Sequence, residues 1–166
     1  MALGNQVLKL KAKEIKNDHK NLDKLIQDMW ETMYNANGVG LAAPQIGLNI
    51  RIFVFDAGSR DKEKKPMTMI NPKIILLDEN KVPYEEGCLS FPEHFAEIDR
   101  PEKIKMEYLD EDNSKKISTF TGFESRIIQH ELDHLNGILF VDHLSRLKRD
   151  VIIRKMRKYK KEKEII

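Results

Sequence analysis

The chain is 166 residues long, and 40% of its residues are hydrophobic and 34% charged. These proportions are typical of a folded globular protein and exclude a disordered chain, while the length favours one domain. The 29 basic and 27 acidic residues give a formal net charge of +2. No apolar run approaches the roughly 18–20 residues that a membrane helix needs, so we expect no contact with a membrane.

The chain contains one cysteine and no N-terminal basic region followed by an apolar stretch. One cysteine excludes an internal disulfide framework, and no secretory signal is visible. We therefore expect a cytoplasmic protein in a reducing compartment, with no disulfide partner.

The first predicted element is an amphipathic helix over residues 22–36, where apolar side chains recur at helical spacing. Asn21 is the candidate N-cap, and Gly38 is the natural stop. Gly38 and Gly40 then frame a glycine-rich turn. It lacks the third glycine and the Lys-Ser/Thr of phosphate loops, and we favour a backbone that a peptide approaches closely.

Short strands are predicted next. Residues 50–56 are β-branched and aromatic and predict a strand, whereas the polar residues 58–65 predict the most mobile internal loop. Residues 67–70 and 73–77 suggest a hairpin with Asn71-Pro72 at its bend.

The second half of the chain adds two alternating strands over residues 103–109 and 116–120, with the turn between them at 110–114. A second helix starts with capping-box spacing at Thr121–Glu124 and runs to Leu135. A last helix begins near Ser145.

This order of elements favours an α+β fold with mostly antiparallel sheets, because too few helices are available to connect parallel strands. We expect one domain over residues 1–147, followed by a basic C-terminal helix or tail over residues 148–166. Residues 146–164 carry ten basic and three acidic side chains. Leu144, Leu147, Val151 and Ile152 are the candidates for packing this helix on the domain.

The strongest chemical motif is His-Glu-Leu-Asp-His at residues 130–134, within the second predicted helix. Positions i and i+4 share a helix face, so His130 and His134 can both bind one divalent metal, with Glu131 beside them as a base. The alternative is a surface helix with two unrelated histidines. The independently predicted helix makes the metal site the better interpretation.

Catalytic metal sites usually have a third protein ligand and an open position for water. Cys88 is a candidate, because it lies in a segment that resembles a constrained turn or strand end. On its residues alone, a buried and inert thiol is the more common role for a lone cysteine. Glu86, Glu93 and Asp142 are rival ligands.

Three segments together resemble the peptide deformylase family. They are Gly-Val-Gly-Leu-Ala-Ala-Pro-Gln at 38–45, Glu-Gly-Cys-Leu-Ser at 86–90 and Gln-His-Glu-Leu-Asp-His at 129–134. The resemblance implies an α+β fold with antiparallel sheets around the metal-binding helix. It also implies removal of the N-formyl group from the initiator methionine of nascent chains, with release of formate.

By position, the resemblance implies that Cys88, His130 and His134 bind the metal. It makes Glu131 the general acid/base, and the family's native metal is typically Fe²⁺, with Zn²⁺ or Ni²⁺ also accommodated. Gln45 and the backbone N–H of Leu89 would form the oxyanion hole. Without the resemblance of the 38–45 segment, we would interpret Gln45 as a polar turn residue.

A formyl-methionine substrate needs an apolar slot near the metal, and its backbone can align beside residues 38–40 like an added strand. The candidate substrate-binding residues are Val39, Gly40, Tyr84, Glu86, Phe123 and Ile127. We also expect Glu86 to pair with Arg100 and brace the segment around Cys88.

Two alternatives remain open at this point. A general metallopeptidase shares the His-Glu-x-x-His pattern, although its third ligand usually lies downstream of the helix. The basic tail permits a catalytically silent ribosome- or RNA-binding module. In the peptide deformylase family a C-terminal helix can dock on the ribosome, whereas a solvated, fraying helix is the more common role of such a charge run.

Overall fold

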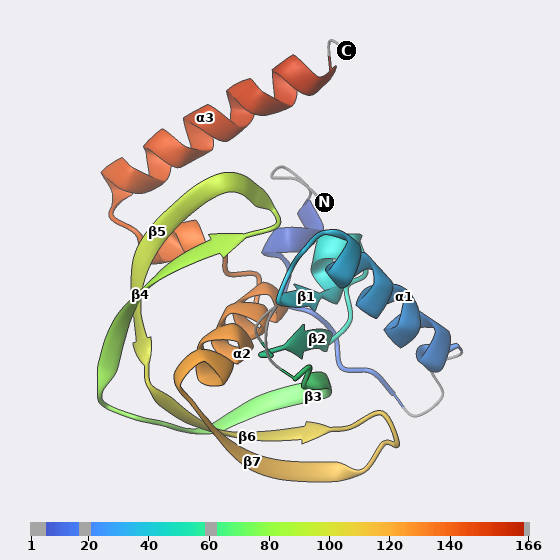
Figure 1. Cartoon of the computed structure of the whole chain (residues 1–166). Helices are drawn as coiled ribbons and strands as arrows, with labels where there is room; N and C mark the ends of the chain where they lie inside the picture. The colour runs from blue at the N-terminus through green and yellow to red at the C-terminus, as the bar shows by residue number, and fades with distance from the viewer. Residues whose placement is uncertain (1–5, 17–20, 59–62, 165–166) are drawn as a thin grey trace.

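Figure 1 shows the computed structural model of the chain, which describes residues 6–16, 21–58 and 63–164. Its elements, in chain order, are η1 (Gln6–Lys9), α1 (Leu22–Asn35), β1 (Gly40–Ala42), η2 (Ala43–Ile46), β2 (Ile52–Asp56), β3 (Pro66–Leu77), β4 (Lys81–Cys88), β5 (Phe91–Pro101), β6 (Lys103–Leu109), β7 (Lys115–Thr121), α2 (Gly122–Leu135), η3 (Phe140–His143) and α3 (Arg146–Glu164). No helix in these ranges is long and apolar enough to cross a membrane.

The strands form two antiparallel sheets. One has the order β1-β2-β3-β6-β7, and β4 pairs with β5 in the other. The predicted mixture of helices and antiparallel sheets is therefore confirmed. The turn predicted at residues 110–114 is also present, because the backbone N–H of Ser114 donates to the Asp110 carboxylate at 2.8 Å.

Strand β2 explains how the larger sheet is covered on both faces. Successive side chains of a strand point to opposite faces. Phe53 and Phe55 pack with α2, whereas Ile52 and Val54 pack with α1, and all four are fully buried. The sheet therefore lies between the two helices, with α2 also reaching the β4–β5 pair (Figure 1).

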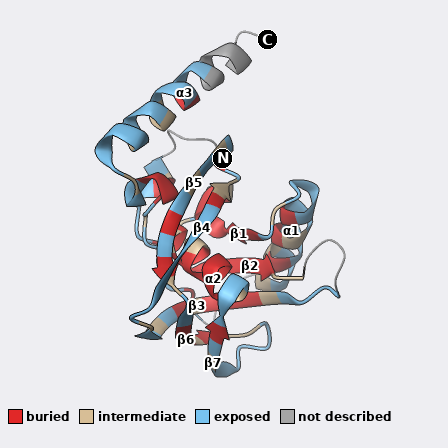
Figure 2. Cartoon of the chain, turned by 60° about the vertical axis from the view of Figure 1, so that its left-hand side comes forward, coloured by how far each residue is buried: buried red, intermediate tan, exposed pale blue. Residues whose placement is uncertain are grey.

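Helix α3 leaves the body of the molecule after η3, and most of its surface is exposed (Figure 2). Ile152 and Met156 attach it to a third apolar cluster, which contains Phe91 and Phe140. The prediction that Leu147 and Val151 pack against the domain was wrong, because their exposed fractions are 77% and 44%. The attachment uses the opposite side of the helix, where Met156 is buried within the charge-rich segment.

The hairpin predicted around Asn71-Pro72 was also wrong, because β3 runs through these residues as one strand. Asn71 has a φ of 50°, and the pairing of β3 with β6 shifts register between Ile70 and Lys73. A β-bulge of this kind bends a strand without reversing it. The Asn71 side chain also exchanges two hydrogen bonds with the backbone of Ile15, each 2.8 Å long.

Both predicted helix starts occupy the expected positions, but neither forms a side-chain cap. Thr121 precedes α2 and Asn21 precedes α1, and neither makes a capping hydrogen bond. Asn21 instead has a left-handed backbone with a φ of 62°. The mobile loop predicted over residues 58–65 lies partly outside the described residues.

Candidate metal centre

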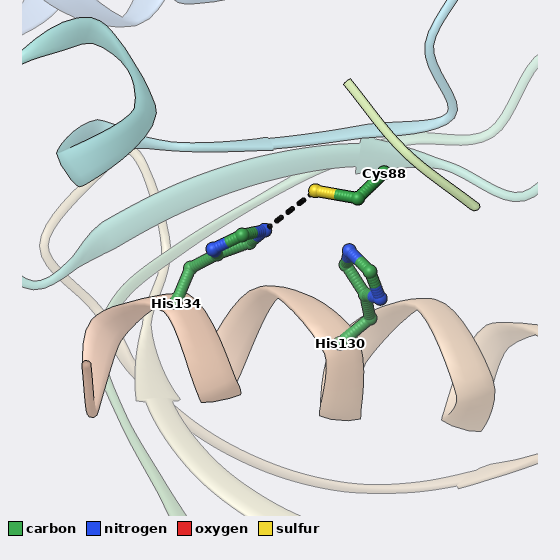
Figure 3. A group of neighbouring side chains, drawn as sticks. All are labelled: Cys88, His130 and His134. Carbon is green, nitrogen blue, oxygen red and sulfur yellow. Dashed lines mark hydrogen bonds between the residues drawn. The ribbon is translucent and has the colours of Figure 1, made fainter. Parts of the chain in front are cut away.

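Two local features bring three potential metal ligands together. His130 and His134 lie one turn apart on α2, and Cys88 is the last residue of β4, beside the turn into β5. Both imidazole rings point toward the Cys88 sulfur (Figure 3). The ligand atoms of the three residues all lie within 4.8 Å of one another, and Cys88 Sγ is 3.2 Å from His134 Nε2.

The donor set fits a divalent transition metal. Thiolate and imidazole are ligands for zinc and related ions, and tetrahedral bonds of about 2.0–2.3 Å place the donor atoms about 3.3–3.6 Å apart. The distance of 3.2 Å between Cys88 Sγ and His134 Nε2 is close to this spacing. The group offers three potential protein ligands, which would leave a fourth position for water or substrate on a bound ion.

Glu86 holds the ring of His130 from behind. Its Oε2 lies 3.0 Å from His130 Nδ1, and Arg100 donates to both carboxylate oxygens at 2.6 and 3.0 Å. Burial alone would raise the pKa of Glu86, but the hydrogen bonds from His130 and Arg100 hold it well below its usual range. The predicted Glu86–Arg100 pair is therefore present, and it supports the segment that ends at Cys88.

The rival third ligands are placed elsewhere. The Glu86 carboxylate is engaged by His130 and arginine, and Asp142 accepts a hydrogen bond from the backbone N–H of Leu139 at 2.9 Å. Glu93 is exposed on the β4–β5 pair. Among the described residues, only Cys88 joins the two histidines in a group of this kind.

The thiol and the imidazoles are electrostatically coupled. Burial would raise the pKa of the Cys88 thiol, but the adjacent His134 and His130 rings lower it well below its usual value. Burial would lower the pKa of His130, but Cys88 and Glu86 raise it. These opposite pKa shifts favour a thiolate next to imidazolium when no metal is bound, so a metal ion that bound both groups would displace a proton.

Glu131 lies between the two histidines in sequence and is 4% exposed. Its Oε2 has no hydrogen-bond partner among the described residues. Burial is the main reason that its pKa is raised to about 7, and the nearby Cys88 and Glu86 charges act in the same direction against the two imidazoles. The result is a buried carboxyl group that can hold or release a proton near neutral pH.

Because Gly40 has no side chain, the Glu131 side chain can occupy the space beside it. A Cβ at position 40 would lie 2.4 Å from Glu131 Oε1 and 2.8 Å from its carboxyl carbon. We expect Gly40→Ala to displace this carboxylate and lower turnover about 100-fold, the effect of a misplacement of about 1 Å, with the formyl-methionyl peptide that the sequence resemblance implies as the test substrate. Metal content should stay at the wild-type level, and both are measured on the same preparation.

Gly122→Ala is the matched control. Gly122 has a φ of +55°, and a Cβ there would meet nothing within 4 Å. This variant should lose some stability because of backbone strain but keep its turnover. Wild-type turnover in Gly40→Ala would show that the position of the Glu131 carboxylate is not critical.

Gln45 lies in η2, immediately after β1, and its side chain reaches the same site. Its Oε1 accepts a hydrogen bond from the backbone N–H of Ala42 at 2.9 Å, which fixes the direction of the amide. Its Nε2 lies 3.7 Å from Cys88 Sγ and 3.3 Å from Ser90 Oγ. Gln45 is buried, so its amide group faces the metal centre as a placed donor and not as a solvent-exposed turn residue.

A pocket with a volume of about 120 Å³ opens to solvent beside Cys88 and His130. Tyr84 and Phe123 form an aromatic pair on its wall, with ring centroids 6.1 Å apart. The structure brings every candidate substrate residue and both proposed oxyanion donors to this one pocket: Val39, Gly40, Gln45, Tyr84, Glu86, Leu89, Phe123 and Ile127.

Arg126 is a pocket residue that the sequence analysis missed. It is buried on α2, donates to Glu86 Oε1 at 3.0 Å and to the backbone oxygen of Ile98 at 2.8 Å, and lies over the Tyr84 ring at 5.6 Å. It thereby ties α2 to both strands of the smaller sheet. Its position one turn before His130, on the helix face that also carries both histidines, was the available signal.

A cysteine and two histidines at metal-binding distance, beside a buried carboxyl group and an open pocket, have the composition of a metal-dependent hydrolase site. A family profile described as polypeptide deformylase matches residues 1–150. A peptide deformylase of Rhizobium meliloti (strain 1021) is 42% identical over 156 residues, which cover 94% of this chain and 90% of that protein.

Solved structures agree. The crystal structure of peptide deformylase from Ehrlichia chaffeensis matches with a TM-score of 0.91 at 38% identity, covering 99% of this chain and 97% of that one. The enzyme from Thermotoga maritima matches with a TM-score of 0.81 at 44% identity, covering 87% of this chain and 95% of that one. The chain belongs to the polypeptide deformylase family. It is a hydrolase that removes the N-formyl group from the initiator methionine of nascent polypeptides.

Proposed function

We propose that Cys88, His130 and His134 bind the divalent metal ion of this deformylase. The observation that carries the proposal is the convergence of one sulfur and two imidazoles within 4.8 Å, beside the buried Glu131. Fe²⁺ is the proposed native ion, with Zn²⁺ or Ni²⁺ also accommodated, because imidazole and thiolate donors suit all three. When bound, the ion supplies Lewis acidity and lowers the pKa of water from about 16 toward 7.

Glu131 is the proposed general acid/base. Its carboxylate takes a proton from the attacking water and later delivers that proton to the leaving amine of the peptide. Burial raises its pKa to about 7, where one group can do both near neutral pH. Its Oε2, for which the described part of the chain offers no hydrogen-bond partner, is the atom proposed to carry the proton.

Gln45 and Leu89 are the proposed oxyanion donors. Attack on the formyl carbonyl places negative charge on its oxygen, and donors already in position stabilise that charge. The Gln45 amide is held by its hydrogen bond to Ala42, with Nε2 facing the site. The backbone N–H of Leu89 is the second proposed donor, from the turn that directly follows Cys88.

The pocket is the proposed binding site for the methionine side chain. Ile127 is buried in its wall, and the exposed faces of Tyr84 and Phe123 line the opening. Val39 and Gly40 also line the pocket, and they are the residues proposed to align the peptide backbone as an added strand. Glu86 also lines this pocket, but its carboxylate is engaged by His130 and Arg100, so we assign it to supporting His130.

The test compares matched peptides that differ only at the N-terminus. Enzyme loaded anaerobically with Fe²⁺ should release formate from formyl-Met-Ala-Ser, while acetyl-Met-Ala-Ser and the internal amide bonds of both peptides stay intact. A general metallopeptidase would cleave the internal bonds instead. Cleavage there at a rate comparable with formate release would contradict the proposal.

We further propose that α3 brings the enzyme to the ribosome in the cytoplasm, because its exposed basic residues suit the phosphates of RNA. Deletion of residues 148–166 is a poor test, because it also removes the buried Met156. A triple variant that changes the exposed Arg154, Lys155 and Arg157 to glutamate should weaken ribosome co-sedimentation. The slope of log K for ribosome binding against log salt concentration should fall in magnitude by about three, one for each lost phosphate contact.

The control carries the same charge change elsewhere on the surface. Lys24, Lys103 and Lys105 are exposed on α1 and β6, and their change to glutamate should leave co-sedimentation at the wild-type level. Formate release from a free tripeptide should be unchanged in both variants. Equal losses of ribosome binding in the two triple variants would show an effect of net charge and not of α3.

A further inference from the structure

A continuous line of hydrogen-bonded side chains runs from the candidate metal centre to the protein surface. Glu86 lies between His130 Nδ1 and Arg100, at 3.0 and 2.6 Å respectively. Arg100 Nη1 then donates to Asp133 Oδ2 at 2.7 Å. The same Asp133 oxygen lies 2.7 Å from Nε2 of His143, a residue that sequence analysis had not assigned to any site.

Burial decreases along this line toward its outer end. The Glu86 and Arg100 side chains are 4% and 5% exposed, Asp133 is 17% exposed, and His143 is 33% exposed. Burial alone would lower the pKa of Arg100 and raise the pKa of Asp133. The hydrogen bonds and charges of their partners instead raise the pKa of Arg100 and lower that of Asp133, which favours the charged form of both groups. A buried pair of this kind is stable only while each partner keeps its hydrogen bonds.

His143 is held by an element that is itself fixed. It is the last residue of η3, whose Phe140 and Val141 are each 1% exposed and pack in the third apolar cluster. Its ring therefore meets Asp133 from a rigid support. Asp133 lies on α2 between the two proposed ligands in sequence, and its carboxylate contacts Arg100 and His143.

We propose that His143 is a positioning residue for the metal centre. By holding Asp133 Oδ2, it keeps that oxygen on Arg100. Arg100 in turn fixes the Glu86 carboxylate, which sets the orientation of the His130 ring. The inference rests on the proposed function only in that His130 binds the metal. It connects η3, the element before α3, to the metal centre.

The best test is a pair of amide substitutions. In His143→Gln, the side-chain nitrogen can reach nearly the position of the histidine Nε2 and donate to Asp133. The side chain in His143→Asn is one methylene shorter, so its nitrogen does not reach Asp133. Both replacements are polar and suit a partly exposed site, so the pair differs mainly in the hydrogen bond to Asp133.

The measurement uses Co²⁺ as the probe metal, with its visible absorption spectrum and its rate of transfer to EDTA as readouts. Loss of an outer-shell partner typically lowers metal affinity by about 10- to 100-fold, and His143 acts through three further residues. We therefore expect His143→Asn to release Co²⁺ about three- to tenfold faster than wild type. His143→Gln should stay within about twofold of wild type, with KM for the formyl peptide unchanged in both.

His94→Asn is the matched control, because His94 is also partly buried but contacts only the backbone oxygen of Pro92 in the described hydrogen bonds, at 2.7 Å. It should release Co²⁺ at the wild-type rate. Wild-type release in a folded His143→Asn, or equally fast release in the Gln and Asn variants, would overturn the inference alone. Failure of the wild-type protein to bind Co²⁺ would instead remove the proposed metal centre itself.

Discussion

Replacement of Glu131 by glutamine should lower kcat for formate release by about 10²–10⁴-fold, the usual value of positioned proton transfer. Glutamine keeps the size of the side chain but cannot accept a proton from water. Glu131 is buried, and its side chain occupies the space that a Cβ at position 40 would need. A replacement of the same size therefore preserves the packing. The variant should bind as much metal as the wild-type protein.

Steady-state assays of formate release, paired with metal analysis of the same sample, check this result. Glu124→Gln is the control, because Glu124 lies on the same helix in its first turn and outside the pocket-lining residues. A Glu131→Gln enzyme that retained more than a tenth of wild-type turnover would exclude Glu131 as the general acid/base.

Replacement of Cys88 by serine should abolish activity by removing the metal. In the proposed site, the Cys88 thiolate supplies the sulfur ligand and neutralises one of the two positive charges of the ion. A serine hydroxyl stays protonated at neutral pH and supplies neither. Removing a residue that only supports a ligand lowers metal affinity by up to about 100-fold, so removing a ligand itself should lower it by at least that factor. Equilibrium dialysis against Zn²⁺ measures this change directly.

The chain contains no other cysteine, so a thiol reagent reports on Cys88 alone. In the metal-free protein the lowered pKa of the thiol should make it react readily, whereas bound metal should protect it. Removal of the metal with a chelator should restore the reaction. Equal reactivity of the loaded and metal-free proteins would contradict ligation by Cys88.

The parts of the site that were predictable are those encoded locally. The helical spacing of His130 and His134 is a property of one helix, and α2 has the predicted C-terminal limit at Leu135. The alternation in residues 103–109 likewise predicted β6 with its observed bounds. In each case, the pattern needs information from neighbouring residues only.

Strands β4 and β5 were not predicted, because their buried positions include charged residues as well as apolar ones. Glu86 and Arg100 occupy inward positions where an alternating strand would normally place aliphatic side chains, and the two charges compensate each other only after the strands pair. That pairing, like the contact between Cys88 and His134, joins residues distant in sequence. The resemblance to a family identified Cys88, whereas the residues alone left Glu86, Glu93 and Asp142 as rivals.

The role of Asn71-Pro72 depended on context in the same way. Asn and Pro favour turns, and nothing local distinguishes a hairpin bend from a bulge within one strand. The neighbouring strand β6 and the backbone of Ile15 decide the outcome, because both bond to residues around the bulge. Neither partner is adjacent to Asn71 in sequence.

X-ray absorption spectroscopy of the Zn²⁺-loaded protein tests the metal centre most directly. The structure predicts a first coordination shell with one sulfur at about 2.3 Å and two imidazole nitrogens at about 2.0–2.1 Å, plus one light atom from solvent. The sulfur contribution should vanish in Cys88→Ser, and one imidazole should be lost in His134→Ala. A shell of nitrogen and oxygen atoms without sulfur in the wild-type protein would contradict the proposed site.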